Sequence, residues 1–78
     1  MRVDIISPEK MIFSGDAKSI TLPGSNGSFQ LLDNHAPIIS TLVEGVVEME
    51  FSNSERKTFE IKGGVVEVRN NKVSLLAD

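Results

Sequence analysis

The side chains best suited to chemistry are those of Asp33 and His35, which stand just before Ala36-Pro37. An imidazole beside a carboxylate could act as a general base, or the two groups could bind a metal. A metal site needs further ligands, however, and a catalytic base needs a nucleophile within hydrogen-bond reach. His35 is the only histidine and the chain has no cysteine, so no recognised ligand spacing is present. We therefore interpret His35 as a structural or interface histidine whose Nδ1 could bond the backbone of the Asp33-Asn34 turn, in preference to the base of a small hydrolase.

A second candidate is the segment Gly24-Ser25-Asn26-Gly27, because paired glycines also occur in phosphate-binding loops. Those loops lead into a helix N-terminus, whereas strand-like residues flank this segment on both sides. We predict a turn whose glycines supply positive φ or a close backbone approach. We also predict that the acidic residues at outward strand positions form a solvated face rather than an acid–base pair: Glu44, Glu48, Glu50, Glu60 and Glu67. No catalytic residue, cofactor site or metal site is therefore predicted.

All the elements that must position these residues are predicted to be strands. In the first half they are Arg2–Ile6, Met11–Phe13 ending at Ser14-Gly15-Asp16, Lys18–Leu22 ending at Pro23-Gly24, a buried run of Phe29, Leu31 and Leu32, and the extended segment Pro37–Val43. In the second half they are Gly45–Phe51, Thr58–Lys62, the segment around Val66 and Val68, and Val73–Leu76, with turns at Asn53-Ser54, Gly63-Gly64 and Asn70-Asn71. Turn signals recur about every 8–10 residues with no helical periodicity between them. The pattern predicts an all-β fold, a flattened two-sheet β-sandwich of about eight to ten short strands.

Size and charge restrict the function further. A chain of 78 residues is one domain with a thin core, and without cysteine it has no disulfide to reinforce that core, so docking to a partner is expected. The net charge is −3 with no basic stripe, which argues against binding to nucleic acid. No apolar run approaches the ~20 residues of a membrane span, and no signal peptide is recognisable at the N-terminus. We therefore expect a soluble, cytoplasmic protein.

An excess of apolar residues points to a binding surface. Those after His35-Ala36-Pro37, together with one beside Val66, are more than a thin core readily hides: Ile38, Ile39, Leu42, Val43 and Val65. Filling both sheets of a sandwich accounts for them equally well, and these residues alone do not decide between core and patch.

Short motifs along the whole chain carry a family resemblance. They are Ser7-Pro8-Glu9, Met11-Ile12-Phe13-Ser14-Gly15, Leu22-Pro23-Gly24, Gly27-Ser28-Phe29, His35-Ala36-Pro37, Gly63–Val68 and Leu76-Ala77-Asp78. Together, and in this order, they resemble the N-terminal β-sandwich domain of the ε subunit of F-type ATP synthase, in a short form without the C-terminal helical hairpin. The resemblance implies one such domain over residues 1–78.

The resemblance also implies a role and partners. It implies a non-catalytic central-stalk subunit, peripheral on the cytoplasmic face of the cell inner membrane, that docks on the γ subunit and the polar loops of the c-ring and couples proton transport to ATP synthesis. By position, the candidate c-ring contact is Gly24, Ser25, Asn26, Gly27 and Ser28, and the candidate γ contact is His35, Ala36, Pro37, Ile38, Ile39, Gly64 and Val65. At Ser28 many relatives carry a carboxylate that faces basic ring loops, whereas the residue here is neutral. That departure leaves no charge to pair at this position.

Two further expectations accompany this hypothesis. Longer family members continue past the Leu-Ala-Asp position into a helical hairpin with a regulatory arm and, in some, a nucleotide site. Because the sequence stops at Asp78, we expect neither ATP binding nor reversible inhibition of ATP hydrolysis. The alternative hypothesis is a generic β-sandwich adaptor that recognises an unrelated protein through the same patch.

Overall fold

The computed structural model describes residues 1–78 and contains nine strands and no helix. The strands are β1 (Arg2–Ile6), β2 (Met11–Asp16), β3 (Ser19–Gly24), β4 (Gly27–Leu32), β5 (Ile38–Leu42), β6 (Gly45–Glu50), β7 (Arg56–Ile61), β8 (Gly64–Arg69) and β9 (Lys72–Ala77). The prediction of an all-β fold of eight to ten short strands is confirmed. No element is therefore a helix of the length and hydrophobicity needed to cross a membrane.

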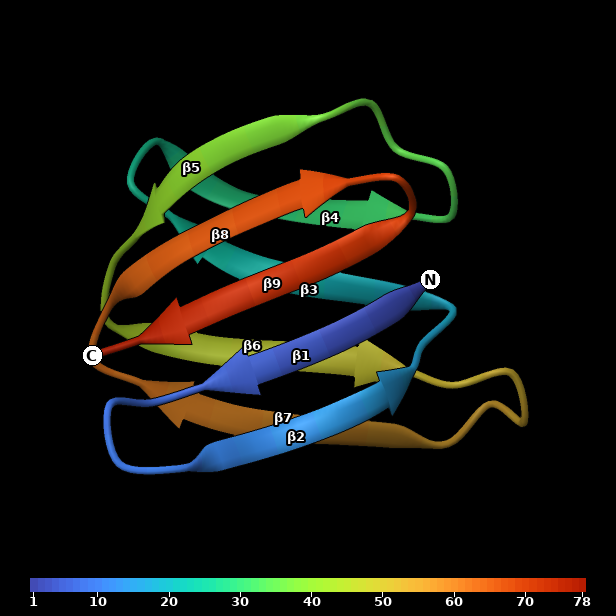
Figure 1. The fold of residues 1–78 in the computed structure, drawn as a ribbon, viewed down its shortest axis with the longest axis horizontal. Coiled ribbons are helices and arrows are strands. Elements are labelled where there is room, and N and C mark those ends of the chain that lie inside the picture. Colours follow the sequence, from blue (N-terminus) through green and yellow to red (C-terminus); the bar gives the residue numbers. More distant parts are fainter.

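The strands form two layers joined along one side. Strands β2-β1-β9-β8-β5 make a five-stranded layer, and β4-β3-β6-β7 make a four-stranded layer behind it (Figure 1). The β1–β9 pair is parallel, and the other pairs are antiparallel. Among the paired strand residues, only Gly24–Leu42 connects the layers, through β3 and β5. The result is a curled sheet that closes into the predicted sandwich.

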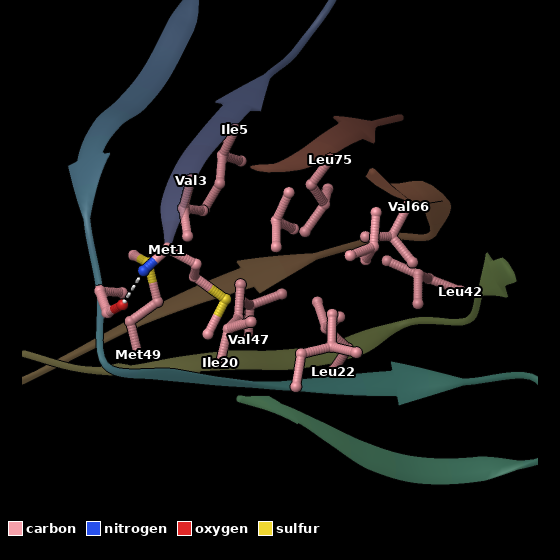
Figure 2. Packing of buried hydrophobic residues seen from close by; sticks show 14 of the residues in the cluster. Met1, Val3, Ile5, Ile20, Leu22, Leu42, Val47, Met49, Val66 and Leu75 are labelled. Carbon is pink, nitrogen blue, oxygen red and sulfur yellow. Dashed lines mark hydrogen bonds between the residues drawn. The ribbon is translucent and has the colours of Figure 1, made fainter. Parts of the chain in front are cut away.

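The core fills the space between the layers because apolar residues alternate along each strand and point inward. Figure 2 shows Val3 and Ile5 of β1 facing Ile20 of β3 and Met49 of β6. The full cluster contains 16 buried residues: Met1, Val3, Ile5, Ala17, Ile20, Leu22, Leu31, Leu42, Val47, Met49, Ile61, Val66, Val68, Val73, Leu75 and Ala77. These inward residues lie on both layers, so the core itself holds the sandwich together.

Aromatic rings close the side of the sandwich formed by β2 and β7. The Phe13 ring of β2 lies 5.9 Å from that of Phe51 and 6.1 Å from that of Phe59, measured between centroids. The Lys57 ammonium sits over the rings of Phe13 and Phe59. Tilted aromatic pairs and a cation–π contact each add stabilisation beyond burial, and they seal this side. The opposite side, where β4 and β5 run, has only uncharged residues in its two strands.

Two predicted turns have the geometry that their residues require. Asn70 and Asn71 have φ of 53° and 58°, as a two-residue type I′ hairpin needs. Gly63 and Gly64 have φ of 147° and 153°. A Cβ on Gly64 would lie 2.3 Å from the carbonyl oxygen of Leu76, so β8 and β9 approach too closely here for any side chain.

Three boundary or burial predictions are wrong. The strand predicted over Met11–Phe13 also includes Ser14-Gly15-Asp16, because these residues pair with β1. Strand β3 continues through Pro23-Gly24. A proline is tolerated there because β3 pairs with β6 only as far as Thr21, so no hydrogen bond to β6 requires an N–H at Pro23. Leu32 was expected in a buried run, yet it is 55% exposed because strand alternation turns it outward next to inward Leu31.

Candidate functional site

Asp33 and His35 do not form a catalytic pair. The Asp33 carboxylate accepts a hydrogen bond from the terminal ammonium of Met1. The same nitrogen donates to the Ala17 carbonyl at 3.0 Å, which is the dashed bond at Met1 in Figure 2. The His35 ring is exposed, and its Nδ1 lies 2.7 Å from the carbonyl oxygen of Ala36. The expected hydrogen bond from His35 to the Asp33-Asn34 backbone is therefore absent. The Asp33 carboxylate bonds Met1 instead, and the His35 ring bonds Ala36.

The Gly24–Ser28 segment forms the tip of the β3–β4 hairpin, with Ser25 and Asn26 as its two central residues. Gly27 has φ of 115°, and a Cβ on buried Gly24 would meet the Gly27 carbonyl oxygen at 2.7 Å. Positive φ and close approach, the two predicted reasons for glycine, thus apply to one glycine each. The backbone N–H of Ser25 donates to the Thr41 carbonyl at 3.2 Å, and the two hydroxyls lie 2.8 Å apart. The tip is anchored to β5, while the side chains of Asn26 and Ser28 stay exposed.

The segments proposed for γ lie at two ends of the molecule. We call the end with the β3–β4 turn and the C-terminus the turn end, and the end with the His35 loop and the N-terminus the loop end (Figure 1). His35-Ala36-Pro37 belongs to the loop end, whereas Gly64 pairs with Leu42 at the turn end. Strands β5 and β8 connect the two positions along a continuous ladder. Residues that appeared as one candidate group in the sequence are thus separated by the length of β5.

The apolar residues after Pro37 divide between core and surface. Leu42 is 6% exposed and belongs to the core, and Ile38 is half-buried and packs against it. Ile39, Val43 and Val65 are 73%, 46% and 39% exposed. Of the two alternatives left open by the sequence, surface exposure applies to these three residues, whereas Leu42 lies in the core and Ile38 packs against it.

An apolar row crosses the outer face of the five-stranded layer, and sequence reasoning missed most of it. Ile6 pairs with Met11 on one side and Leu76 on the other, and Leu76 pairs with Val65. Met11, Leu76 and Val65 are 52%, 56% and 39% exposed, and Ile6 is half-buried. A shallow groove of about 370 Å³ runs along part of this row, lined by Ile6, Ser7, Pro8, Val65, Leu76, Ala77 and Asp78. The adjacent leucines Leu75-Leu76 were a usable signal, since one of two neighbours in a strand must face outward.

A polar network occupies the same outer face next to the apolar row. Asp4 accepts a hydrogen bond from the Ser14 hydroxyl at 2.7 Å and forms ion pairs with Arg2 and Lys72 at 3.5 and 3.6 Å. The Ser14 hydrogen bond, opposed by desolvation and helped by the two cations, lowers the pKa of the Asp4 carboxyl below its ordinary value of 3.8. This face therefore combines an apolar row with a fixed charged network.

The outer face of the four-stranded layer has a different character. Glu48 and Glu50 of β6 and Glu60 of β7 share it, and only Glu48 has an ion-pair partner, Arg56 at 3.4 Å. The single acidic face that the sequence suggested is smaller than expected, because Glu67 lies on the other layer and Glu44 in the β5–β6 turn rather than in a strand. The two outer faces thus differ, one with an apolar row and the other acidic and solvated.

Comparison with known proteins identifies the family. The family model described as "ATP synthase, Delta/Epsilon chain, beta-sandwich domain" matches residues 1–78. The chain belongs to this delta/epsilon family. It is 42% identical to the ATP synthase epsilon chain of Leptospira borgpetersenii over 78 residues, which are 100% of this chain and 61% of that protein. It is 43% identical to the epsilon chain of Chlorobaculum tepidum over 76 residues, which are 97% of this chain and 86% of that one.

Solved structures show the same delta/epsilon sandwich at lower sequence identity. A chain in the Euglena gracilis mitochondrial ATP synthase superposes with a TM-score of 0.91 at 19% identity, over 96% of this chain and 48% of that one. A chain in the Tetrahymena thermophila mitochondrial ATP synthase, from its central stalk and c-ring, superposes with a TM-score of 0.83 at 23% identity, over 97% and 61%. The fold of the family is thus the fold of this chain, which spans about three fifths of the Leptospira relative. The resemblance seen in the sequence is confirmed.

Proposed function

We propose that this domain is a non-catalytic part of the rotor of an F-type ATP synthase. It docks on the γ subunit and on the polar loops of the c-ring, at the cytoplasmic face of the membrane, and helps couple proton transport to ATP synthesis. Two findings support the proposal. The relatives at about 40% identity are named ATP synthase epsilon chains, and one matching fold comes from a structure described as a central stalk and c-ring. We extend the relatives' role to this chain through the domain they share.

The observation that carries the proposal is the contrast between the two outer faces. Exposed apolar rows on small soluble domains mark interaction surfaces, whereas a carboxylate-rich face favours water. The row spans β2, β1, β9 and β8, a width of about 14 Å at the usual strand spacing. We assign the γ contact to this row together with Ile39, which lies on the same outer face of β5. Compared with the sequence-based set, this assignment keeps Ile39 and Val65 and adds Ile6, Met11 and Leu76. It omits the remaining five residues: His35, Ala36, Pro37, Ile38 and Gly64.

The c-ring contact is assigned to the β3–β4 tip. Asn26 and Ser28 expose uncharged hydrogen-bonding groups at the turn end, while Ser25 is held by Thr41. Without a carboxylate at Ser28, this contact relies on hydrogen bonds and shape rather than charge pairing. The adjoining β5–β6 turn is fixed to the same corner, since the N–H of Val43 donates to the Pro23 carbonyl at 2.9 Å.

Transmitting torque requires that the two contacts do not move relative to each other. Strand β5 carries Ile39 near one end and Thr41, the anchor of the tip, near the other. A hydrogen-bonded ladder of this kind deforms little, so a force applied at the tip reaches the γ contact through the backbone. Two contacts on one rigid body also raise the effective concentration of each for its partner.

Co-purification tests the proposal with a matched pair of variants. Val65 of the apolar row and Val46 on the acidic face are both exposed strand valines, 39% and 51%. We expect the tagged unmodified chain and Val46→Asp to retain γ and the c-ring from solubilised membranes, and Val65→Asp to lose γ while remaining folded. Recovery of no ATP synthase subunit with the unmodified chain would favour the adaptor hypothesis. Equal γ recovery with both variants would remove the apolar row from the γ contact.

A further inference from the structure

The tip of the β3–β4 hairpin holds the one asparagine–glycine pair in the sequence, Asn26-Gly27. We propose that Asn26 is a site of spontaneous deamidation, through which the turn acquires a carboxylate as the protein ages. The site follows from the identity of the two residues, their exposure and the absence of restraints on the Asn26 side chain.

The reaction needs only water. The backbone nitrogen of Gly27 forms a bond to Cγ of Asn26, and the bond from Cγ to the side-chain nitrogen breaks. That nitrogen leaves as ammonia with the proton given up by the Gly27 N–H, and a succinimide ring remains. Water then adds to one of the two ring carbonyls, which yields aspartate or isoaspartate at position 26.

Asn26 is the least restrained of the five asparagines: Asn26, Asn34, Asn53, Asn70 and Asn71. The Asn53 side chain bonds Glu55 twice, at 3.0 and 3.1 Å, and the Asn71 side-chain oxygen accepts the Asn34 N–H at 2.7 Å. The side chains of Asn34 and Asn70 make no hydrogen bond, but each precedes a residue with a Cβ, which crowds the attacking nitrogen. Only Asn26 combines an unbonded side chain with a following glycine.

The attacking nitrogen is also accessible. Gly27 is exposed, and a Cβ placed on it would meet no atom within 4 Å. Gly24 and Gly27 are the last paired residues of the β3–β4 ladder, so this pair can open without breaking the other β3–β4 pairs. Glycine tolerates the range of φ through which the backbone must pass for the ring to close.

The product changes the proposed c-ring contact, and this consequence rests on the function proposed above. An aspartate at position 26 is ionised at pH 7 and takes the formal net charge from −3 to −4. Isoaspartate also inserts a methylene into the main chain of a two-residue turn, which opposes the Gly24–Gly27 pairing. A contact made by neutral groups thereby becomes charged two residues before Ser28.

The experiment incubates the purified chain at physiological temperature and mildly alkaline pH and follows each asparagine by peptide mass spectrometry with fragmentation. We expect the Asn26 amide to be lost first, with isoaspartate among the products, while Asn53 and Asn71 keep theirs. A parallel sample unfolded in urea gives the deamidation rate of Asn26 in the absence of structure. If Asn26 stays intact in the folded chain over the time in which the unfolded chain loses it, the hairpin protects the site and the proposal is wrong.

A second measurement separates this proposal from the proposed function. Asn26→Asp reproduces one of the two charged products, and Asn26→Gln keeps a neutral amide that closes the ring poorly. We expect the first variant to bind reconstituted c-ring differently from the unmodified chain and the second to bind like it. Equal binding by both variants would remove the tip from the c-ring contact. Deamidation measured in the isolated chain would be unaffected by that result.

Discussion

Changing either of two adjacent isoleucines to aspartate should affect a different property, because strand alternation places them on opposite faces of β5. Ile38→Asp should lower stability, and Ile39→Asp should weaken binding to γ. Ile38 pairs with Val68 and packs against the core, whereas Ile39 is 73% exposed. Ile39→Asp should leave the fold nearly unchanged, within about 0.5 kcal/mol, as is usual for exposed positions. Ile38→Asp should lower the free energy of unfolding by about 2–4 kcal/mol, since it places a carboxylate among apolar neighbours.

These costs translate into measurable shifts. A domain of 78 residues has a total stability of about 4–12 kcal/mol, so Ile38→Asp removes a large part of it. At about 4–8 °C per kcal/mol for this size, the Tm falls by roughly 8–30 °C. If Ile39 is buried by γ, its loss and the unpaired charge together weaken binding by about 2–4 kcal/mol, or at least about 30-fold in Kd.

Circular dichroism against temperature and calorimetric titration with purified γ measure the two quantities. The assignment of Ile39 to the γ contact is wrong if Ile39→Asp binds γ as tightly as the unmodified chain. If Ile38→Asp melts at the unmodified temperature, the inward placement of Ile38 is wrong instead. Each outcome concerns one face of β5 only.

Four further expectations follow. Gly64→Ala should destabilise the domain by more than about 2 kcal/mol in urea unfolding while Gly27→Ala costs about 1, because both have positive φ but only Gly64 lacks space for a Cβ; equal costs would contradict the close-approach argument. The pKa of Asp4 is lower in the folded chain than in the unfolded chain, so ionised Asp4 stabilises the fold at any pH above its unfolded pKa. This stabilisation is lost as the pH falls through the folded pKa. The free energy of unfolding measured against pH should show the loss at acid pH, and Asp4→Asn should abolish it. Asn26→Ala should leave the Tm unchanged but reduce proton pumping per ATP in the assembled enzyme, and unchanged pumping would argue against a coupling role for the tip. Calorimetric titration of the 78-residue chain with ATP should give no saturable heat, since an all-β domain without a basic cluster has no helix N-terminus to hold the phosphates; micromolar binding would refute this.

Local chemistry made much of the fold predictable from the sequence. Alternation of apolar residues with Glu48 and Glu50 fixes the inward face of β6, since side chains on a strand alternate strictly. Asn70 and Asn71 tolerate positive φ, which fixes the hairpin between β8 and β9. The motifs spread from Ser7 to Asp78 were sufficient to indicate the family, because they follow one another in the right order along the whole chain.

The candidate site was less predictable because it depends on residues far apart in the sequence. Ile6, Leu76 and Val65 form one row only because β1 pairs in parallel with β9 and β9 pairs with β8. No local pattern encodes that strand order, and a segment taken alone does not show which of its neighbours lie beside it. The same holds for Asp33, whose partner is the terminal ammonium of Met1 rather than the nearby His35.

The sequence by itself determined where the strands lie to within a few residues, which face of most strands is apolar and where the chain must turn. These features depend on neighbouring residues and on backbone sterics. The tertiary structure alone decided that Ile39 and Val65 lie on the surface, while Leu42 lies in the core and Ile38 packs against it. It also decided that the His35 loop and the Gly64 bend lie at opposite ends of β5. The physical reason is that burial and proximity depend on how two sheets stack and on their strand order, and long-range pairing sets both.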